Sequence, residues 1–340
     1  MLNSVSTISL LLFWADLWLM LCSLYTIVES CFEVKDIESY LESRLEVESK
    51  ENPTKVKDIE SYLESRLPTK TRKHDYENYL CSALYPKNLQ YAYYAIRAFN
   101  VELAMVRGSV SSQLIGKMRM QFWRESIDSI FKGNPPHHPV ALLLNSTLEH
   151  CKLSSLFFKR IINERDANLD DPPYMSIRDL ESYGENTASC LLYLQLELLG
   201  IKNIQADHAA SHIGKATGIV TILRAFPYLA SKRRMYLPAD TLAKFKISEE
   251  AIFREGPTVK GLEDAVFEVA TTAHDHLLTA RSFLPEIQRE AMPVFLSSIA
   301  CDSYLKRLEK YNFNVFEPKL SVRDWKLPFL IWWNYRSNKF

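Results

Sequence analysis

Apolar residues recur at helical spacing along the chain from about residue 74 onward. One broad apolar face combines residues that lie three to five positions apart or next to each other: Leu114, Met118, Phe122, Trp123, Ile127, Ile130 and Phe131. This spacing predicts an amphipathic helix with Trp123 on its core side. Gly133, followed by Pro135, ends the helical pattern and indicates a stop just before it.

Later segments repeat the helical spacing. Ser176 and Asp179 resemble a helix cap, and apolar residues then recur at helical intervals until Gly200. Further helices fit residues 206–225, 248–254, 260–283 and 286–310, whereas no convincing two-residue alternation predicts a strand. The pattern predicts an all-α body over residues 74–320, followed by a short aromatic tail over residues 321–340.

The first 73 residues have a different sequence pattern. Residues 5–28 are apolar and long enough to cross a bilayer, although Asp16 lies near their middle. Residues 1–33 are therefore a membrane segment, a buried helix or the product of a mispredicted start, and they lack the features of a secretory signal or a transit peptide. The string VKDIESYLESRL then occurs twice, at 34–45 and 56–67, so residues 34–73 form a duplicated linker of amphipathic helices or of a local duplication without separate function.

Composition and charge narrow the function classes. The 340 residues include only nine glycines and carry 41 basic and 41 acidic side chains, which favours packed helices and gives no electrostatic case for nucleic acid. The six cysteines are scattered without the Cys-x-x-Cys spacing of a zinc ribbon. No glycine-rich phosphate loop is present, which argues against nucleotide-dependent chemistry.

Two segments carry a family resemblance. Residues 91–131 contain YAYYAIRAFNVELAMV and MRMQFWRESIDSIF, and residues 212–238 read HIGKATGIVTILRAFPYLASKRRMYLP. In order and spacing they resemble the two signature regions of the squalene/phytoene synthase family. The resemblance covers roughly residues 75–310 and implies the all-α isoprenoid synthase fold.

The resemblance also implies where catalytic carboxylates would stand. In the family, each signature helix carries Asp-x-x-x-Asp, because carboxylates four residues apart share a helix face and bind Mg²⁺, which grips a prenyl diphosphate. The corresponding positions here hold Val101, Met105, Ala225 and Leu229, and we expect Pro227 to disturb the second helix. We therefore expect no metal, no cofactor and no prenyl transfer.

The residues around the lost motifs keep their family-like character. Two interpretations of them remain open: they line a remnant anion or lipid pocket, or they stabilise the fold. A lone glutamate cannot organise a metal cluster, so we expect it to be solvated or locally paired. The candidate residues are Glu102, Arg224, Arg233, Arg234 and Tyr236.

Further strings resemble one branch of the family whose members assist the assembly of mitochondrial respiratory complex I. They include AFNVELA, RMQFW, NPPHHPVA and, over residues 206–220, ADHAASHIGKATGIV. This resemblance implies a non-catalytic pseudo-synthase on the matrix face of the inner membrane, with complex I subunits or other assembly factors as partners. The alternative is an isoprenoid- or lipid-binding protein, or a residual transferase, since apolar Val101, Met105 and Leu229 suit a dry pocket.

Several other constellations favour structural roles. His208 and His212 share a helix face beside Asp207, but no third metal ligand is apparent, and His274 and His276 diverge on a helix. We interpret three more features as structural: the loops at 135–139 and 168–172, and the core cysteines Cys190 and Cys301.

Overall fold

The computed structural model describes residues 67–110 and 112–340, and every regular element in these ranges is helical. This confirms the all-α prediction. Residues 67–340 form one compact unit. The helices are α4 (Leu67–His74), α5 (Tyr76–Ser82), α6 (Gln90–Ser109), α7 (Gln113–Ile130), α8 (Pro139–His150), α9 (Ser155–Ala167), α10 (Ile177–Gly184), α11 (Cys190–Leu198), α12 (Ile204–Ser231), α13 (Ala239–Lys244), α14 (Glu249–Glu255), α15 (Leu262–Ser282), α16 (Met292–Phe295), α17 (Ser297–Lys310) and α18 (Leu327–Arg336).

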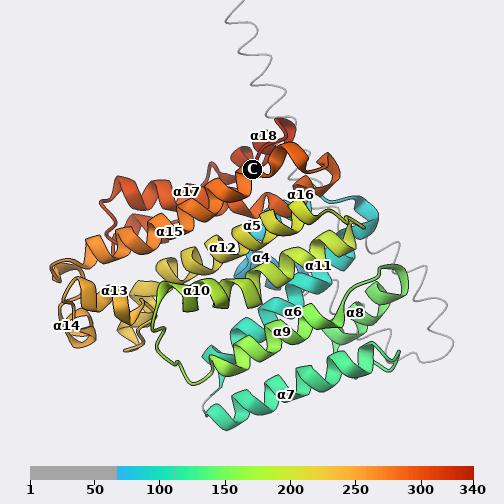
Figure 1. The fold of residues 1–340 in the computed structure, drawn as a ribbon. Helices are drawn as coiled ribbons and strands as arrows, with labels where there is room; N and C mark the ends of the chain where they lie inside the picture. The colour runs from blue at the N-terminus through green and yellow to red at the C-terminus, as the bar shows by residue number, and fades with distance from the viewer. Residues whose placement is uncertain (1–66, 111) are drawn as a thin grey trace, which may run out of the picture. The chain divides into compact units, whose positions relative to one another are not determined.

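The 28-residue helix α12 is the axis of the bundle. It packs against α10, α11, α15 and α17, and Figure 1 shows it running through the middle of these helices. Its small and apolar residues are buried on several sides, as a helix surrounded by others requires. The helix continues through Pro227 to Ser231, so the expected disturbance was wrong. Phe226, Leu229 and Ala230 are buried around the proline and hold this last turn in place.

The helix predicted before Gly200 contains one irregular turn. The Asp179 carboxylate accepts a hydrogen bond from the Ser176 backbone N–H at 2.8 Å, which confirms the predicted cap. Between α10 and α11 the chain forms a π-helical turn, Glu185–Ser189. This turn crosses α12 so closely that a Cβ atom on Gly214 would lie 2.3 Å from the Ser189 backbone nitrogen. Only glycine permits this approach.

The apolar face predicted on α7 divides into two parts. Trp123, Ile127 and Ile130 are buried, and the Trp123 ring meets Phe99 edge to face at 5.4 Å between centroids. Leu114 and Met118 instead remain exposed, because α7 lies at the lower edge of the bundle in Figure 1.

The two ends of the described chain contribute to the same region. The compact unit begins at Leu67, a few residues before the boundary predicted at 74. Helix α18, in the segment predicted as a tail, packs Leu327 and Ile331 against residues of α5 and α17. The apolar stretch 5–28 and the duplicated strings up to residue 66 lie outside the described residues. Within the residues described, no helix is both long and apolar enough to span a bilayer.

Candidate functional site: a cavity between the two signature helices

A cavity of about 300 Å³ lies between α6 and α12, the helices that carry the two signature segments. From α6 it is lined by Val101 and Met105, the two positions predicted for the first aspartate motif. From α12 it is lined by Thr217, Gly218, Thr221 and Arg224. Residues of the α4–α5 segment, including Asp75 and Glu77, complete the wall.

The charged groups in this wall are mostly neutralised within the chain. Asp75 accepts a hydrogen bond from Arg97 Nε at 2.6 Å, and the side chains of this pair are only 13% and 7% exposed. Glu77 forms an ion pair with Arg224. Both carboxylates come from the α4–α5 segment and face arginines on the two signature helices. The cavity is therefore more polar than the dry pocket that the apolar replacements suggest.

Arg165 is a third cation in the cavity wall. Its Nη1 donates to the Tyr183 hydroxyl at 2.8 Å, and its Nη2 donates to the Asn100 side-chain oxygen at 3.4 Å. The Nε atom is buried and has no hydrogen-bond partner among the residues that the structure describes. No carboxylate in this part of the chain forms an ion pair with Arg165, so it leaves a positive charge at the cavity.

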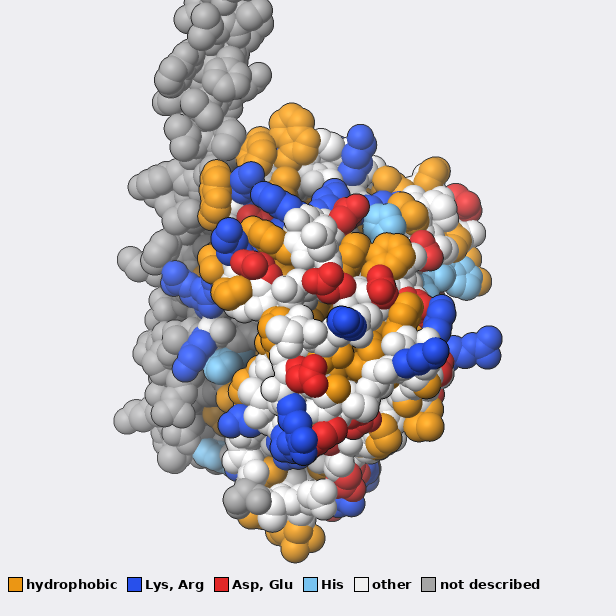
Figure 2. Space-filling view, turned by 90° about the vertical axis from the view of Figure 1, so that its left-hand side faces the viewer, with side chains coloured by type: hydrophobic (Ala, Val, Ile, Leu, Met, Phe, Trp, Pro, Cys, Tyr) orange, Lys and Arg blue, Asp and Glu red, His pale blue; other side chains and the backbone are white. Residues whose placement is uncertain are grey.

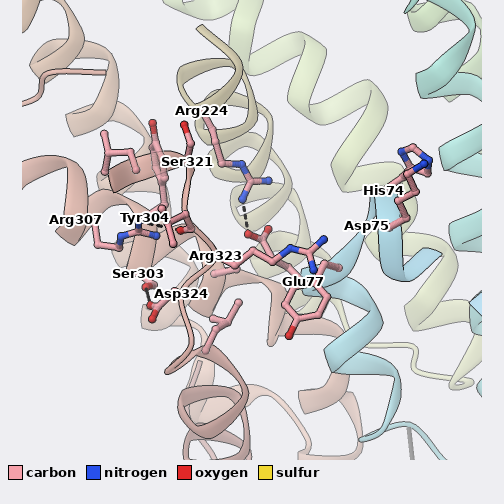
Figure 3. Close-up of a pocket in the computed structure, with 16 residues that line it drawn as sticks. His74, Asp75, Glu77, Arg224, Ser303, Tyr304, Arg307, Ser321, Arg323 and Asp324 are labelled. Carbon is pink, nitrogen blue, oxygen red and sulfur yellow. Dashed lines mark hydrogen bonds and ion pairs between the residues drawn. The ribbon is translucent and has the colours of Figure 1, made fainter. Parts of the chain in front are cut away.

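A second cavity of about 260 Å³ lies on the other side of the Glu77–Arg224 pair, which lines both cavities. Figure 3 shows Ser303, Tyr304 and Arg307 of α17 on its left side, with the pair near the centre. The Ser303 hydroxyl donates to Asp324 at 2.6 Å, and Arg307 donates to the backbone carbonyl of Val322 at 3.0 Å. These polar groups bind each other and so brace the segment before α18.

The remaining candidate residues do not gather at the cavity. Among the described residues, Ala225, Leu229 and Glu102 are absent from its lining, and Leu229 is buried in the bundle. Arg233 lies on the surface, where it pairs with Glu250. Of the predicted remnant-pocket residues, only Arg224 faces the cavity.

Arg234 and Tyr236 meet at a different place, the loop residue Asp171. The Asp171 carboxylate pairs with Arg234 Nε at 3.2 Å and accepts a hydrogen bond from the Tyr236 hydroxyl. It also binds Arg107 through two guanidinium nitrogens. Burial and this carboxylate raise the pKa of Tyr236. The cluster ties the end of α6 to the segment after α12.

The donors at the cavity do not fit a magnesium–diphosphate site. Mg²⁺ prefers several oxygen ligands, yet the positions predicted for the four motif aspartates hold Val101, Met105, Ala225 and Leu229. Asp75 and Glu77, the carboxylates nearest to the cavity, are each occupied by an arginine. Among residues 67–110 and 112–340 no group of three or more His, Cys, Asp or Glu side chains could hold a metal ion.

The structure contains one contact between histidines that the sequence did not predict. His212 Nδ1 lies 2.8 Å from Nδ1 of His276 on α15, whose Nε2 lies 2.8 Å from the Glu181 carboxylate. Burial, and then the neighbouring His276, lower the pKa of His212 to about 4. His208, which shares the helix with His212, instead stacks on Phe283. A helical-spacing argument within one segment cannot find a pair formed between α12 and α15.

Comparison with known proteins identifies relatives of this chain. Residues 71–326 match the family model described as squalene/phytoene synthase. A Rattus norvegicus protein named "NADH dehydrogenase (ubiquinone) complex I, assembly factor 6" is 49% identical over 76% of this chain and 77% of its own length. The Homo sapiens protein of the same name is 46% identical over 77% of this chain and 78% of its own length.

A solved structure agrees on the fold. A dehydrosqualene synthase crystal structure superposes with a TM-score of 0.68 at 17% identity, over 79% of this chain and 93% of that one. At this identity the likeness concerns the helical architecture alone. The match of residues 71–326 to the family model shows that this chain belongs to the squalene/phytoene synthase family.

Proposed function

We propose that this chain is a non-catalytic member of its family that assists the assembly of mitochondrial respiratory complex I. The observation that carries the proposal is the 46–49% identity, over three quarters of the chain, to proteins named complex I assembly factor 6. Its partners would be complex I subunits or other assembly factors. Its location would be the mitochondrion, at the matrix face of the inner membrane.

The chemistry of the cavity supports the non-catalytic part of the proposal. Ionisation of a prenyl diphosphate needs a metal or an equivalent set of cations to stabilise the leaving group. Here the positions predicted for the motif on α6 hold Val101 and Met105, whose side chains offer no oxygen ligand to Mg²⁺. Arg224 is held by Glu77, so binding of a diphosphate there would first require separation of an ion pair.

Depletion in cells tests the assembly role. We expect cells without this protein to lose fully assembled complex I on a native gel, and we expect the wild-type chain to restore it. A Val101→Asp/Met105→Asp variant asks whether loss of the carboxylates matters for assembly. Normal complex I levels after depletion would refute the proposal.

Arg165 favours a second candidate function, the binding of an anionic lipid or isoprenoid in the cavity. A guanidinium with a buried, unsatisfied Nε suits an anionic head group. The volume of about 300 Å³ is at the lower end of ligand sites, so most of a long apolar tail would remain outside.

Incubation with farnesyl diphosphate, with and without Mg²⁺, separates the candidates. The assembly proposal predicts no product in either case, and product that requires Mg²⁺ would contradict its non-catalytic part. Retention of the diphosphate without metal would support a carrier if Arg165→Gln abolished it. Arg119→Gln, on the exposed face of α7, is the matched control for removal of one positive charge.

A further inference from the structure

The outer face of α18 exposes aromatic rings to solvent. Leu327 and Ile331 point inward and are 4% and 2% exposed. Phe329, Trp332 and Trp333 lie two to six residues after Leu327 and occupy the other side, where they share a face with Arg336 at positions i, i+3, i+4 and i+7. We call this surface, together with Trp325 just before the helix, the aromatic face.

Three rings of the aromatic face form a cluster. The ring centroids of Phe329, Trp332 and Trp333 are 6.1–6.4 Å apart. Trp325 is 83% exposed and Trp333 is 55% exposed. Large aromatic side chains in water forgo the free energy that burial would provide, and a contiguous group of them marks an interaction site.

Positive charge surrounds the rings. Residues 323–340 contain four basic side chains and one acid, Asp324, which already accepts hydrogen bonds from Ser303 and a backbone N–H. None of the four forms an ion pair with a described residue. Arg323 and Lys326 instead lie over the rings of Tyr76 and Trp325, and the other two are Arg336 and Lys339. In Figure 2, hydrophobic and basic side chains lie side by side near the top of the coloured part of the molecule.

The exposed stripe of α7 differs in charge. Leu114 and Met118 are 69% and 64% exposed, but two of the cations near them are paired: Lys117 with Asp170, and Arg124 with Asp166. Arg119 donates to the Ser109 hydroxyl and forms no ion pair with a described residue, so the stripe has one uncompensated cation. The aromatic face has four such cations and also carries large aromatic rings.

We propose that the aromatic face docks on a lipid bilayer that contains anionic head groups. Tryptophan rings favour the head-group level of a membrane, where their apolar area is covered and the indole N–H keeps a polar partner. Unpaired Lys and Arg beside them add attraction to anionic lipids. The lining of the cavity between α6 and α12 includes no residue of α18, so the aromatic face is separate from that cavity. The inference deepens the proposed membrane-side location but does not depend on the assembly role.

Quenching by brominated lipid tests the docking directly. The chain has six tryptophans, and Trp14 and Trp18 lie in the apolar stretch near its start, so the full chain is used with these two replaced by Phe. Vesicles of brominated phosphatidylcholine mixed with phosphatidylglycerol should quench the remaining emission. Vesicles without phosphatidylglycerol should quench it less. Absence of quenching by the mixed vesicles would overturn the proposal.

Variants assign the quenching to the aromatic face. Trp325→Phe/Trp333→Phe should remove most of the quenched signal. Arg336→Gln/Lys339→Gln should weaken vesicle affinity about fivefold for each charge removed, and added salt should reduce this difference. Leu114→Ala/Met118→Ala on α7 is the matched control and should bind as the parent does.

Two further outcomes contradict the proposal. Loss of vesicle binding in the α7 control, with the α18 variants unaffected, would move the docking site to α7. If the aromatic face binds none of the vesicles but an acidic protein partner shields its rings from solvent, the face is a protein interface. Because the assay uses purified protein and lipid, its result is independent of complex I levels in depleted cells.

Discussion

Asp171 offers the sharpest test of how this scaffold is held together. The Asp171→Asn substitution keeps the size of the side chain and removes its charge. Asparagine also tolerates the positive φ of 51° at this position, so the backbone need not change. The amide would place a donor among Arg107, Arg234 and Tyr236, which are donors themselves.

The expected loss follows from burial and the number of bonds. The Asp171 side chain is 15% exposed, and those of Arg234 and Arg107 are 24% and 32% exposed. Removing one partner of a buried ion pair costs about 3–5 kcal/mol, and partial exposure of both arginines lowers this to about 2–3 kcal/mol. For a unit of this size, such a loss corresponds to a fall in Tm of about 4–12 °C.

The neighbouring residue provides a matched control. Asp170 pairs with Lys117 at 3.3 Å, and the two side chains are 46% and 55% exposed. Asp170→Asn should therefore cost about 0.5 kcal/mol or less. Urea unfolding followed by circular dichroism measures both variants. Equal stability of the two variants would refute the structural role of Asp171 and reopen Arg234 and Tyr236 as ligand-binding residues.

Three further predictions concern packing and titration. Gly214→Ala should destabilise the fold by about 3 kcal/mol or more, because its Cβ would lie 2.3 Å from the Ser189 backbone nitrogen. In the control Gly108→Ala, the new Cβ meets no atom within 4 Å, so this variant should be neutral or slightly stabilising. Equal urea midpoints for the two variants would contradict the prediction. The pKa of His212 is about 4 in the folded protein against 6.5 for the free side chain, so the unfolded state binds more protons between these values and stability should fall as the pH drops from 6.5 toward 4. His212→Gln should flatten that decline in urea titrations, and an unchanged slope would show that other groups cause it. Burial raises the pKa of the Cys301 thiol to about 11, so iodoacetamide at pH 8 should modify this thiol only after urea is added. Peptide mass spectrometry measures the labelling, and rapid labelling of the folded protein would contradict the buried position of Cys301.

Local spacing predicted the helices well where one face is regularly apolar. The cap at Ser176 and the stop near Gly133 depend on neighbouring residues, so the sequence is sufficient to find them. The passage of α12 through Pro227 was missed because buried contacts from other helices outweigh the local preference of proline.

The candidate site divides in the same way. The order of the two signature segments can be read from the sequence, and the resemblance to the family then predicts which four positions would carry the motif aspartates. The sequence could not reveal that Glu77 pairs with Arg224, 147 positions away. It also could not reveal that Asp171 forms an ion pair with Arg234 and a hydrogen bond with Tyr236. Such partners are chosen by how the helices pack.

The sequence by itself thus determined an all-α scaffold and the residue types at the positions where the family resemblance implies metal-binding carboxylates, which are Val101, Met105, Ala225 and Leu229. Tertiary structure alone decided that intramolecular carboxylates occupy Arg97 and Arg224 and that the rings of α18 remain outside. The physical reason is that residue type and spacing are local properties, whereas ion pairing and burial depend on which distant side chains the packed helices bring within a few ångströms of one another.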